Sequence, residues 1–183
     1  MDFSDGDLVR EVRAGSNVAF ERLMRRYGRL VYRIAYGFTG NRESAMDVAQ
    51  DTFLKVHARL GDWREEGGLK NWVARIAANE GLNWSRSARR HPTCELDETA
   101  FVQSDPPQEE RLLEREAHEA LHRSLSALSP RQRLAVVLRY FQGMSAREIG
   151  TVLECSEGTA RNILFRSLRK LQSILVAAEE SMP

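Results

Sequence analysis

The chain has 183 residues, of which 42% are hydrophobic and 29% charged, and a formal net charge of +1. This composition is sufficient for packed cores and predicts a soluble protein of one large or two small domains. Two lone cysteines, Cys94 and Cys155, form neither a disulfide framework nor a zinc site and favour a reducing compartment. The N-terminus is acidic, and the longest aliphatic run, residues 134–138, is too short to span a bilayer. The sequence therefore predicts no signal peptide, no membrane insertion and a cytoplasmic location.

Apolar residues spaced three and four apart predict helices through most of the first 90 residues. The predicted helices cover residues 17–39, 42–60 and 69–88. Ser16 and Asn41 are suited to cap the first two helices. Gly81 weakens the third helix by roughly 1 kcal/mol. Residues 61–68, which contain glycines at both ends, are predicted to form a loop.

Charges are sorted along the chain, although they nearly cancel in total. Basic residues prevail over 70–92, acidic residues over 94–119 and basic residues again over 158–171. Two basic blocks around an acidic block indicate two regions that bind a polyanion on either side of a spacer. The spacer, residues 91–112, also holds three prolines and few aliphatic residues, which predicts a flexible linker.

Helix signals resume after the spacer. A helix is predicted over 113–128, and Ser129 with Gln132 forms a capping-box pattern that starts another one, with Pro130 at its first position. The predicted fold class is all-α, with two helical domains joined by a flexible acidic linker. The predicted boundaries are a first domain over 1–90, the linker over 91–112, a second domain over 113–178 and a tail over 179–183.

Residues 145–171 predict a helix-turn-helix unit. Ser145 and Glu148 form a capping-box pattern that begins a short helix, and a longer helix follows the break at residues 155–158. One side of the longer helix carries Arg161, Asn162, Phe165, Arg166 and Arg169. Such a face fits the major groove, where arginine contacts guanine, asparagine adenine and an aromatic ring the thymine methyl group. A solvated helical hairpin is the plainer alternative.

Two further expectations concern the same domain. Arginines that could hold backbone phosphates are Arg131, Arg133, Arg139 and Arg147. Glu154 lies at the turn position where helix-turn-helix units often have glycine. Because a left-handed conformation costs a residue other than glycine roughly 1–2 kcal/mol, we expect this turn to be built differently.

These motifs, in this order, resemble those of the group IV, or extracytoplasmic-function (ECF), sigma factors of bacterial RNA polymerase. SAMDVAQDTFLKVHARL (residues 44–60) is similar to the helix with which these factors dock on the polymerase clamp. NWVARIAANEGLNWSRSARR (71–90) is similar to the helix that meets the downstream (−10) promoter element. Residues 128–171 are similar to the domain that recognises the upstream (−35) element.

The resemblance implies three sets of site residues. The set expected to bind core polymerase is Asp47, Gln50, Asp51, Phe53 and Leu54. The set expected at the −10 element is Trp63, Arg75, Asn79, Asn83 and Arg86, because melting needs aromatic, amide and basic groups around an extruded base. The set expected at the −35 element is Arg147, Arg161, Asn162, Phe165, Arg166 and Arg169.

The predicted function is that of a sigma factor, which binds core polymerase, recognises both promoter elements and promotes melting. Implied partners are the clamp and flap of core RNA polymerase, promoter DNA and an anti-sigma factor, with the chain a monomer in the holoenzyme. Ile163 and Leu168 replace frequent arginines, and with Phe165 they are a candidate anti-sigma surface. A stand-alone regulator that binds duplex operators is the alternative. Since the chain lacks a phosphate-binding loop, a Cys–His or Ser–His constellation and a metal cluster, we expect no enzyme activity, cofactor or metal.

Overall fold

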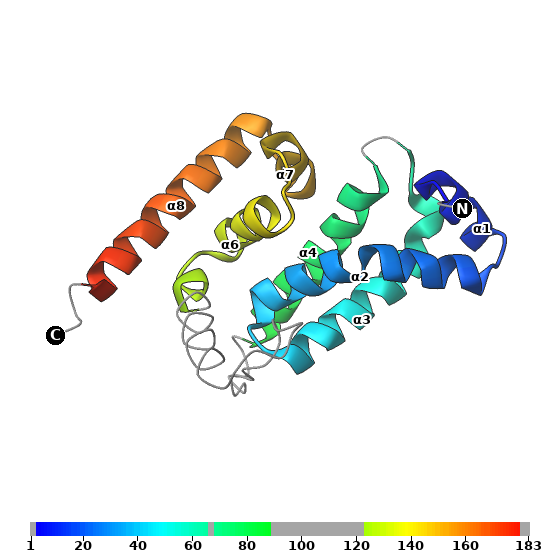
Figure 1. The fold of residues 1–183 in the computed structure, drawn as a ribbon, viewed down its shortest axis with the longest axis horizontal. Coiled ribbons are helices and arrows are strands. Elements are labelled where there is room, and N and C mark those ends of the chain that lie inside the picture. The colour runs from blue at the N-terminus through cyan, green and yellow to red at the C-terminus, as the bar shows by residue number, and fades with distance from the viewer. Residues whose placement is uncertain (1–2, 66–67, 89–122, 180–183) are drawn as a thin grey trace, which may run out of the picture.

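The computed structural model describes residues 3–65, 68–88 and 123–179, most of them in helices (Figure 1). In chain order the elements are α1 (Asp5–Arg13), α2 (Asn17–Thr39), α3 (Arg42–Arg59), the 3₁₀ turn η1 (Leu60–Asp62), α4 (Leu69–Ala88), α6 (Pro130–Val136), the π-helical turn η2 (Val137–Phe141), α7 (Ala146–Val152) and α8 (Glu157–Glu179). These residues contain no strand, so the predicted all-α class is confirmed. The predicted linker over 91–112 lies outside the described residues.

Helices α2, α3 and α4 pack around a common apolar core, and local caps set where they begin and end. The Ser16 side chain accepts a hydrogen bond from the Ala19 N–H (3.2 Å), and Asn41 accepts one from the Ser44 N–H (2.8 Å), as predicted. Gly40 ends α2 with a φ of 72°, a conformation that glycine adopts at little cost. The core includes Leu23, Val31 and Ile34 of α2, Val56 of α3 and Val73 and Ala77 of α4.

Gly81 lies within the continuous helix α4, at a position where Phe38 of α2 fills the space beside the backbone. A Cβ atom at Gly81 would lie 2.2 Å from a ring carbon of Phe38. The absence of a side chain therefore lets the ring pack directly on the α4 backbone. This close packing explains a residue that otherwise weakens the helix by about 1 kcal/mol.

Helix α1 was not among the predicted elements, which began at residue 17. Its signals are nevertheless local: the Ser4 hydroxyl and the Asp7 carboxylate form a capping box, and Leu8 and Val9 are fully buried. The capping pattern alone would have located the helix start. We attribute the omission to the short length of α1, which holds too few apolar residues for a clear helical period.

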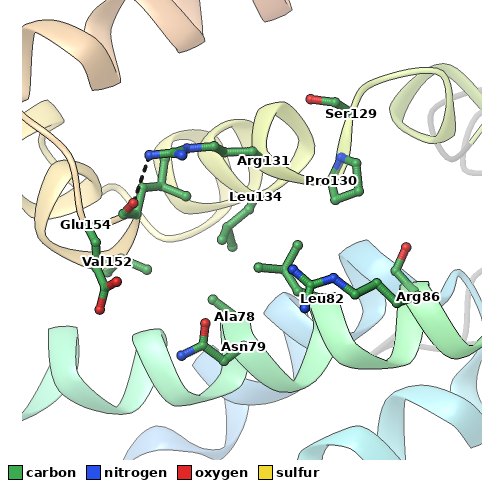
Figure 2. Close-up of a pocket in the computed structure, with 12 residues that line it drawn as sticks. Ala78, Asn79, Leu82, Arg86, Ser129, Pro130, Arg131, Leu134, Val152 and Glu154 are labelled. Carbon is green, nitrogen blue, oxygen red and sulfur yellow. Dashed lines mark hydrogen bonds between the residues drawn. The ribbon is translucent and has the colours of Figure 1, made fainter.

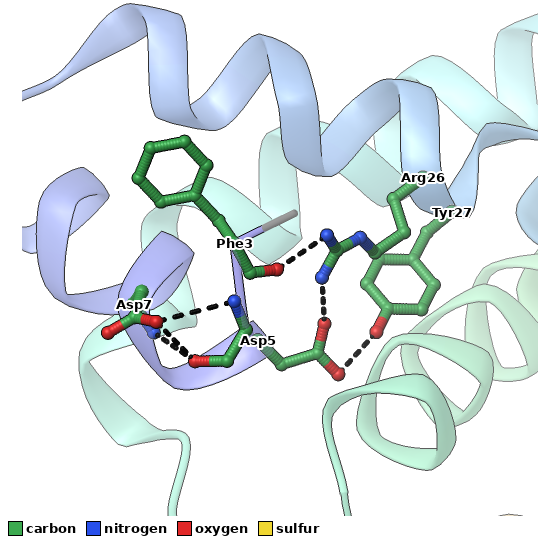
Figure 3. A network of polar contacts seen from close by, with 6 residues as sticks. Phe3, Asp5, Asp7, Arg26 and Tyr27 are labelled. Carbon is green, nitrogen blue, oxygen red and sulfur yellow. Dashed lines mark hydrogen bonds and ion pairs between the residues drawn. The ribbon is translucent and has the colours of Figure 1, made fainter. Parts of the chain in front are cut away.

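A polar network fastens the start of α1 to α2 (Figure 3). Arg26 donates hydrogen bonds to the carbonyl of Phe3 (2.6 Å) and to the carboxylate of Asp5 (2.8 Å). The Tyr27 hydroxyl donates to the other oxygen of Asp5 (2.6 Å). Burial and the hydrogen bond to Asp5 raise the pKa of Tyr27, so the phenol remains a donor over the physiological range. The hydrogen bond from Tyr27 to Asp5 therefore keeps its donor around neutral pH.

Helices α6, α7 and α8 contain the predicted helix-turn-helix unit. Capping boxes start both α6 and α7, through Ser129 with Gln132 and through Ser145 with Glu148, as predicted. Hydrogen bonds from the backbone and hydroxyl of Ser145 lower the pKa of Glu148, so that carboxylate stays charged at neutral pH. Ala160 and Ser167 of α8 are fully buried and mark the side that packs inward.

The turn between α7 and α8 has ordinary helix-ending geometry, contrary to our expectation. The N–H of Cys155 donates to the carbonyl of Gly150 (2.9 Å), and that of Glu154 donates to the carbonyl of Thr151 (3.4 Å). This pair of bonds is the Schellman motif, whose C′ residue is left-handed. Glu154 adopts that conformation with a φ of 52°, although it is not glycine. The expectation of a different turn was therefore wrong, because the two hydrogen bonds hold Glu154 in the unfavourable region.

Replacing Glu154 with glycine is expected to raise the free energy of unfolding by about 1 kcal/mol, because glycine lacks the steric penalty at this φ. Urea unfolding followed by circular dichroism measures the change. Glu154→Ala is the matched control, since it removes the carboxylate but keeps a Cβ atom. A glycine variant no more stable than the alanine variant would show that the turn stores no strain.

The two groups of helices lie against each other and share one apolar core (Figure 1). A Cβ atom at Gly37 of α2 would lie 2.8 Å from a methyl group of Val137, so α2 and η2 approach closely. Arg33 of α2 donates to the carbonyl of Phe141 (3.0 Å). Leu134 and Leu138 belong to the same buried cluster as the first group. The predicted division into domains over 1–90 and 113–178 stays a prediction, since these contacts join the two.

Candidate nucleic-acid interface

One side of α4 carries the polar residues expected at the −10 element. They recur at intervals of three or four positions and are Arg75, Asn79, Asn83 and Arg86. This spacing places them along one side of a helix. Asn79, Asn83 and Arg86 are exposed, whereas Arg75 is half-buried. Val73 and Ala77 on another side are fully buried, so the α4 side predicted to meet DNA is distinct from the side that packs in the core.

Trp63, also expected at the −10 element, lies in the core instead. Its side chain is only 8% exposed and packs in the cluster that contains Leu60 and Leu69. The indole N–H has no hydrogen-bond partner among the described residues. Because its indole is buried, Trp63 offers little surface to DNA. Its side chain instead packs in the core beneath the start of the loop. The place of Trp63 in the sequence, beside Gly61 and Asp62, suggested direct contact with DNA. The buried position of its side chain does not fit such a contact.

A cavity of about 420 Å³ separates the α4 side from the second group of helices (Figure 2). Asn79 and Arg86 line it from α4, and Arg131 and Glu154 line it from the opposite side. Arg75 forms an ion pair with Glu154 across the same gap, with 3.5 Å between nitrogen and oxygen. The second group of helices therefore occupies part of the space in front of the predicted −10 residues.

The outer face of α8 presents the side chains expected at the −35 element. All of them are exposed: Arg161, Asn162, Phe165, Arg166 and Arg169, together with Arg147 on α7. The Phe165 ring is 61% exposed, and the guanidinium of Arg169 lies 5.8 Å from its centroid. Arg161 pairs with Glu157 one turn earlier. This face combines positive charge, an amide and an exposed ring, which are the groups that contact phosphates and base edges in a major groove.

The candidate anti-sigma surface is only partly exposed. Leu168 lies on the surface beside the exposed ring of Phe165, but Ile163 is half-buried and packs against the core. The expectation that Ile163 is an exposed apolar residue was therefore wrong. Consecutive residues of a helix point in different directions, so the exposure of Asn162 does not indicate that the side chain of Ile163 turns toward the core.

Three of the arginines expected at backbone phosphates have internal partners. Arg133 donates to the carbonyls of Leu125 (2.8 Å) and Ser126 (2.9 Å). Arg139 donates to the carbonyl of Met144 (3.0 Å), and Arg131 to that of Leu153 (2.9 Å). Arg133 is half-buried and serves the fold, which corrects its expected role. Arg147 remains an exposed candidate.

An exposed ridge on α3 contains most of the residues expected to bind polymerase. Asp47, Gln50, Asp51 and Leu54 are spaced three or four apart and lie on the surface, with Leu54 62% exposed. Phe53 is half-buried and packs against the core, so it contributes less to this ridge. Met46, which was not among the predicted residues, is exposed next to the ridge. The sequence alone does not reveal that this apolar residue lies at the surface beside two carboxylates, because the orientation of the helix has to be known first.

The parts of the chain that the structure describes contain neither a candidate membrane span nor a metal cluster. No helix within them is long and apolar enough to cross a membrane. No group of three or more His, Cys, Asp or Glu residues is placed there to hold a metal ion.

Comparison with known proteins matches both groups of helices to one family. The model described as sigma-70 region 2 matches residues 23–91, and that described as sigma-70, region 4 matches residues 118–171. The RNA polymerase sigma-H factor of Pseudomonas aeruginosa is 31% identical over 93% of this chain and 93% of the relative. The ECF RNA polymerase sigma factor SigM of Mycobacterium tuberculosis is 32% identical over 94% of this chain and 85% of the relative.

A solved structure has the same fold. It is the sigma factor RpoE in complex with the anti-sigma factor NepR from Bartonella quintana, with a TM-score of 0.67 and 21% identity over 85% of this chain and 96% of that one. The sequence relatives cover nearly the full length, and the two sigma-70 regions occur in the expected order. This chain belongs to the ECF family of RNA polymerase sigma factors.

Proposed function

We propose that this sigma factor divides its work among three helices: α3 docks on core polymerase, α4 meets the −10 element and α8 recognises the −35 element. The observation that carries the division is that the polar and charged residues of each helix gather on an exposed side, away from the shared core: acidic residues on α3, and amide and basic residues on α4 and α8. Polymerisation chemistry belongs to the polymerase, so the chain itself needs neither catalytic residues nor a cofactor. It acts in the cytoplasm, as one copy per holoenzyme.

Promoter-dependent transcription tests this proposal. Purified protein is mixed with core polymerase and a library of duplexes randomised at both elements, and the transcripts are sequenced. Enrichment of two separate sequence elements upstream of a common start site is the expected result. If no template yields transcripts while the free protein binds a duplex operator tightly, the alternative of a stand-alone regulator replaces the proposal.

An anti-sigma factor is the proposed regulatory partner. Support comes from the structural relative RpoE, which is in complex with the anti-sigma factor NepR. Exposed Phe165 and Leu168 on α8 supply apolar surface that such a protein would cover. A partner that covers these residues would compete with DNA for the same face, because Phe165 lies among the predicted −35 contacts.

A further inference from the structure

The first group of helices (α1–α4) and the second group (α6–α8 with η2) meet at a contact that leaves no spare room. The neighbours of a Cβ atom built at Gly37 of α2 all belong to the side chain of Val137, and the nearest would lie 2.8 Å away. Val137 is buried, and its β-branched side chain has few alternative rotamers. Because buried side chains pack at crystal-like density, this contact cannot accept even one added methyl group without moving.

Polar bonds on either side of that contact also join the two groups. Arg33 of α2 donates to the carbonyl of Phe141 (3.0 Å). In the opposite direction, Arg133 of α6 approaches the carbonyls of Gly37 and Phe38 (both 3.4 Å), which lie at the negative end of the α2 dipole. The two groups are therefore held in one particular arrangement by apolar packing and by charged donors from both sides.

The second group also presents carboxylates to cations of α4. Arg75 of α4 pairs with Glu154, in the turn after α7, at 3.5 Å. Hydrogen bonds from Ser145 and then the charge of Lys70, in the first turn of α4, lower the pKa of Glu148 on α7. Cations such as Lys70 and Arg75 are the groups that phosphates of a nucleic acid contact. Within the described residues, these carboxylates take the place that phosphates would have at this end of α4.

The ion pair gives a reason for the unusual residue at position 154. Glu154 has a φ of 52°, a conformation in which glycine would be less strained, but glycine would leave Arg75 without its carboxylate. The Glu154 side chain is 71% exposed, so solvent screens this pair and its own contribution is small. The packed contact between Gly37 and Val137 must therefore supply the larger part of the attachment.

We propose that the second group of helices is a built-in cover over the polar side of α4, which must open at the contact between Gly37 and Val137 before single-stranded DNA reaches Asn79 and Arg86. The cavity between them, about 420 Å³, has the size of a small-molecule site and does not admit a strand (Figure 2). The inference rests on the proposed function, in which this side of α4 meets the −10 element. A covered site binds only in the open fraction of molecules, so its apparent affinity falls by that fraction.

The test adds the forbidden methyl group to the full-length protein, without polymerase. Small-angle X-ray scattering measures the radius of gyration of Gly37→Ala, and fluorescence anisotropy measures its binding to a labelled single strand carrying the −10 element selected from the library. We expect a larger radius and an affinity about tenfold higher, because overpacking drives the two groups apart and raises the open fraction. Since alanine forms helices better than glycine, α2 itself should not be weakened.

Three further variants serve as controls. Gly28→Ala adds the same methyl group to the same helix at a position where nothing lies within 4 Å, so both measurements should be unchanged. Gly37→Ala combined with Val137→Ala removes the colliding atoms and should restore the compact chain and its weaker binding. Arg86→Ala, added to Gly37→Ala, should reduce the gain in affinity, because the uncovered side of α4 then lacks one of its cations.

A surface substitution keeps the test decisive if Gly37→Ala proves unstable. Glu154→Gln removes the carboxylate opposite Arg75 without touching the core, and it should raise the affinity for the same strand about threefold at low salt and less at high salt. Glu21→Gln is the matched control, since it removes a carboxylate from the exposed pair with Arg25 (2.6 Å) on α2. An equal effect of the two substitutions would overturn the part assigned to Glu154.

The outcomes separate the cover from the proposed function. An unaltered chain that is already extended in solution, or a folded Gly37→Ala protein that stays compact, would overturn the cover. An open Gly37→Ala chain that binds the strand no better, or a gain that persists with Val137→Ala, would overturn it as well. If the unaltered holoenzyme shows no preference at the −10 element, the proposed function fails instead, whereas the scattering comparison still decides whether the free chain is closed.

Discussion

Alanine at both Arg161 and Arg166 is expected to abolish recognition of the −35 element while leaving the affinity for core polymerase unchanged. Both side chains extend from the outer face of α8, away from buried Ala160 and Ser167. A good arginine contact to a base contributes about 1–3 kcal/mol of discrimination. Loss of both should therefore reduce the preference for the correct element by about 30-fold or more. Transcription from promoters with intact and substituted −35 elements measures this ratio.

Salt dependence and a charge-matched control identify what the two arginines contact. Each lost phosphate contact lowers the slope of log affinity against log salt by about 1, whereas a lost base contact changes sequence preference instead. Arg10→Ala with Arg25→Ala removes the same charge, and Arg25 pairs with Glu21 four residues away much as Arg161 pairs with Glu157. Loss of core binding in the Arg161 and Arg166 variant, or equal −35 defects in both double variants, would refute the assignment of α8.

Sequence reasoning located the helices where short-range chemistry decides them. The caps at Ser16, Asn41, Ser129 and Ser145 all form with groups three residues away, so the pattern is complete within a few positions. The exposed face of α8 was likewise predictable, because helical spacing alone puts Arg161 and Phe165 on one side. The same argument placed Asp47 and Asp51 on a surface ridge of α3.

Residues whose partners are distant in the chain were assigned less well. Arg133 looked like an exposed phosphate ligand, but it packs among carbonyls that include Gly37 and Phe38 of α2 at 3.4 Å. Trp63 was expected to be exposed in its loop, yet tertiary packing buries it. Arg13, at the end of α1, donates hydrogen bonds to the carbonyls of Leu60 and Trp63, which lie 47 and 50 residues away, so no local pattern marks it. In each case the environment of the side chain is created by the packing of elements that are distant in the chain. Helix periodicity carries no information about that packing.

Charge reversal on α3, with Asp47→Arg and Asp51→Arg, is expected to eliminate binding to core polymerase. Neither carboxylate makes an ion pair or hydrogen bond with any described residue, and both are exposed, so the fold does not depend on them. If the ridge meets a complementary positive surface, two arginines there place like charges together, which costs several kcal/mol. An affinity loss of about 100-fold or more is expected, measured by fluorescence anisotropy of labelled protein with core polymerase.

Asparagine at the same two positions separates attraction from repulsion. Asp47→Asn with Asp51→Asn keeps side-chain size and removes only the negative charges, so its affinity should fall between those of the unaltered and arginine proteins. Helical circular dichroism and thermal unfolding should be unchanged in both variants, since both positions lie on the solvent side of α3. Full core binding by the arginine variant would leave exposed Leu54 and Met46 as the remaining α3 surface for docking, and electrostatic attraction would play no part in it.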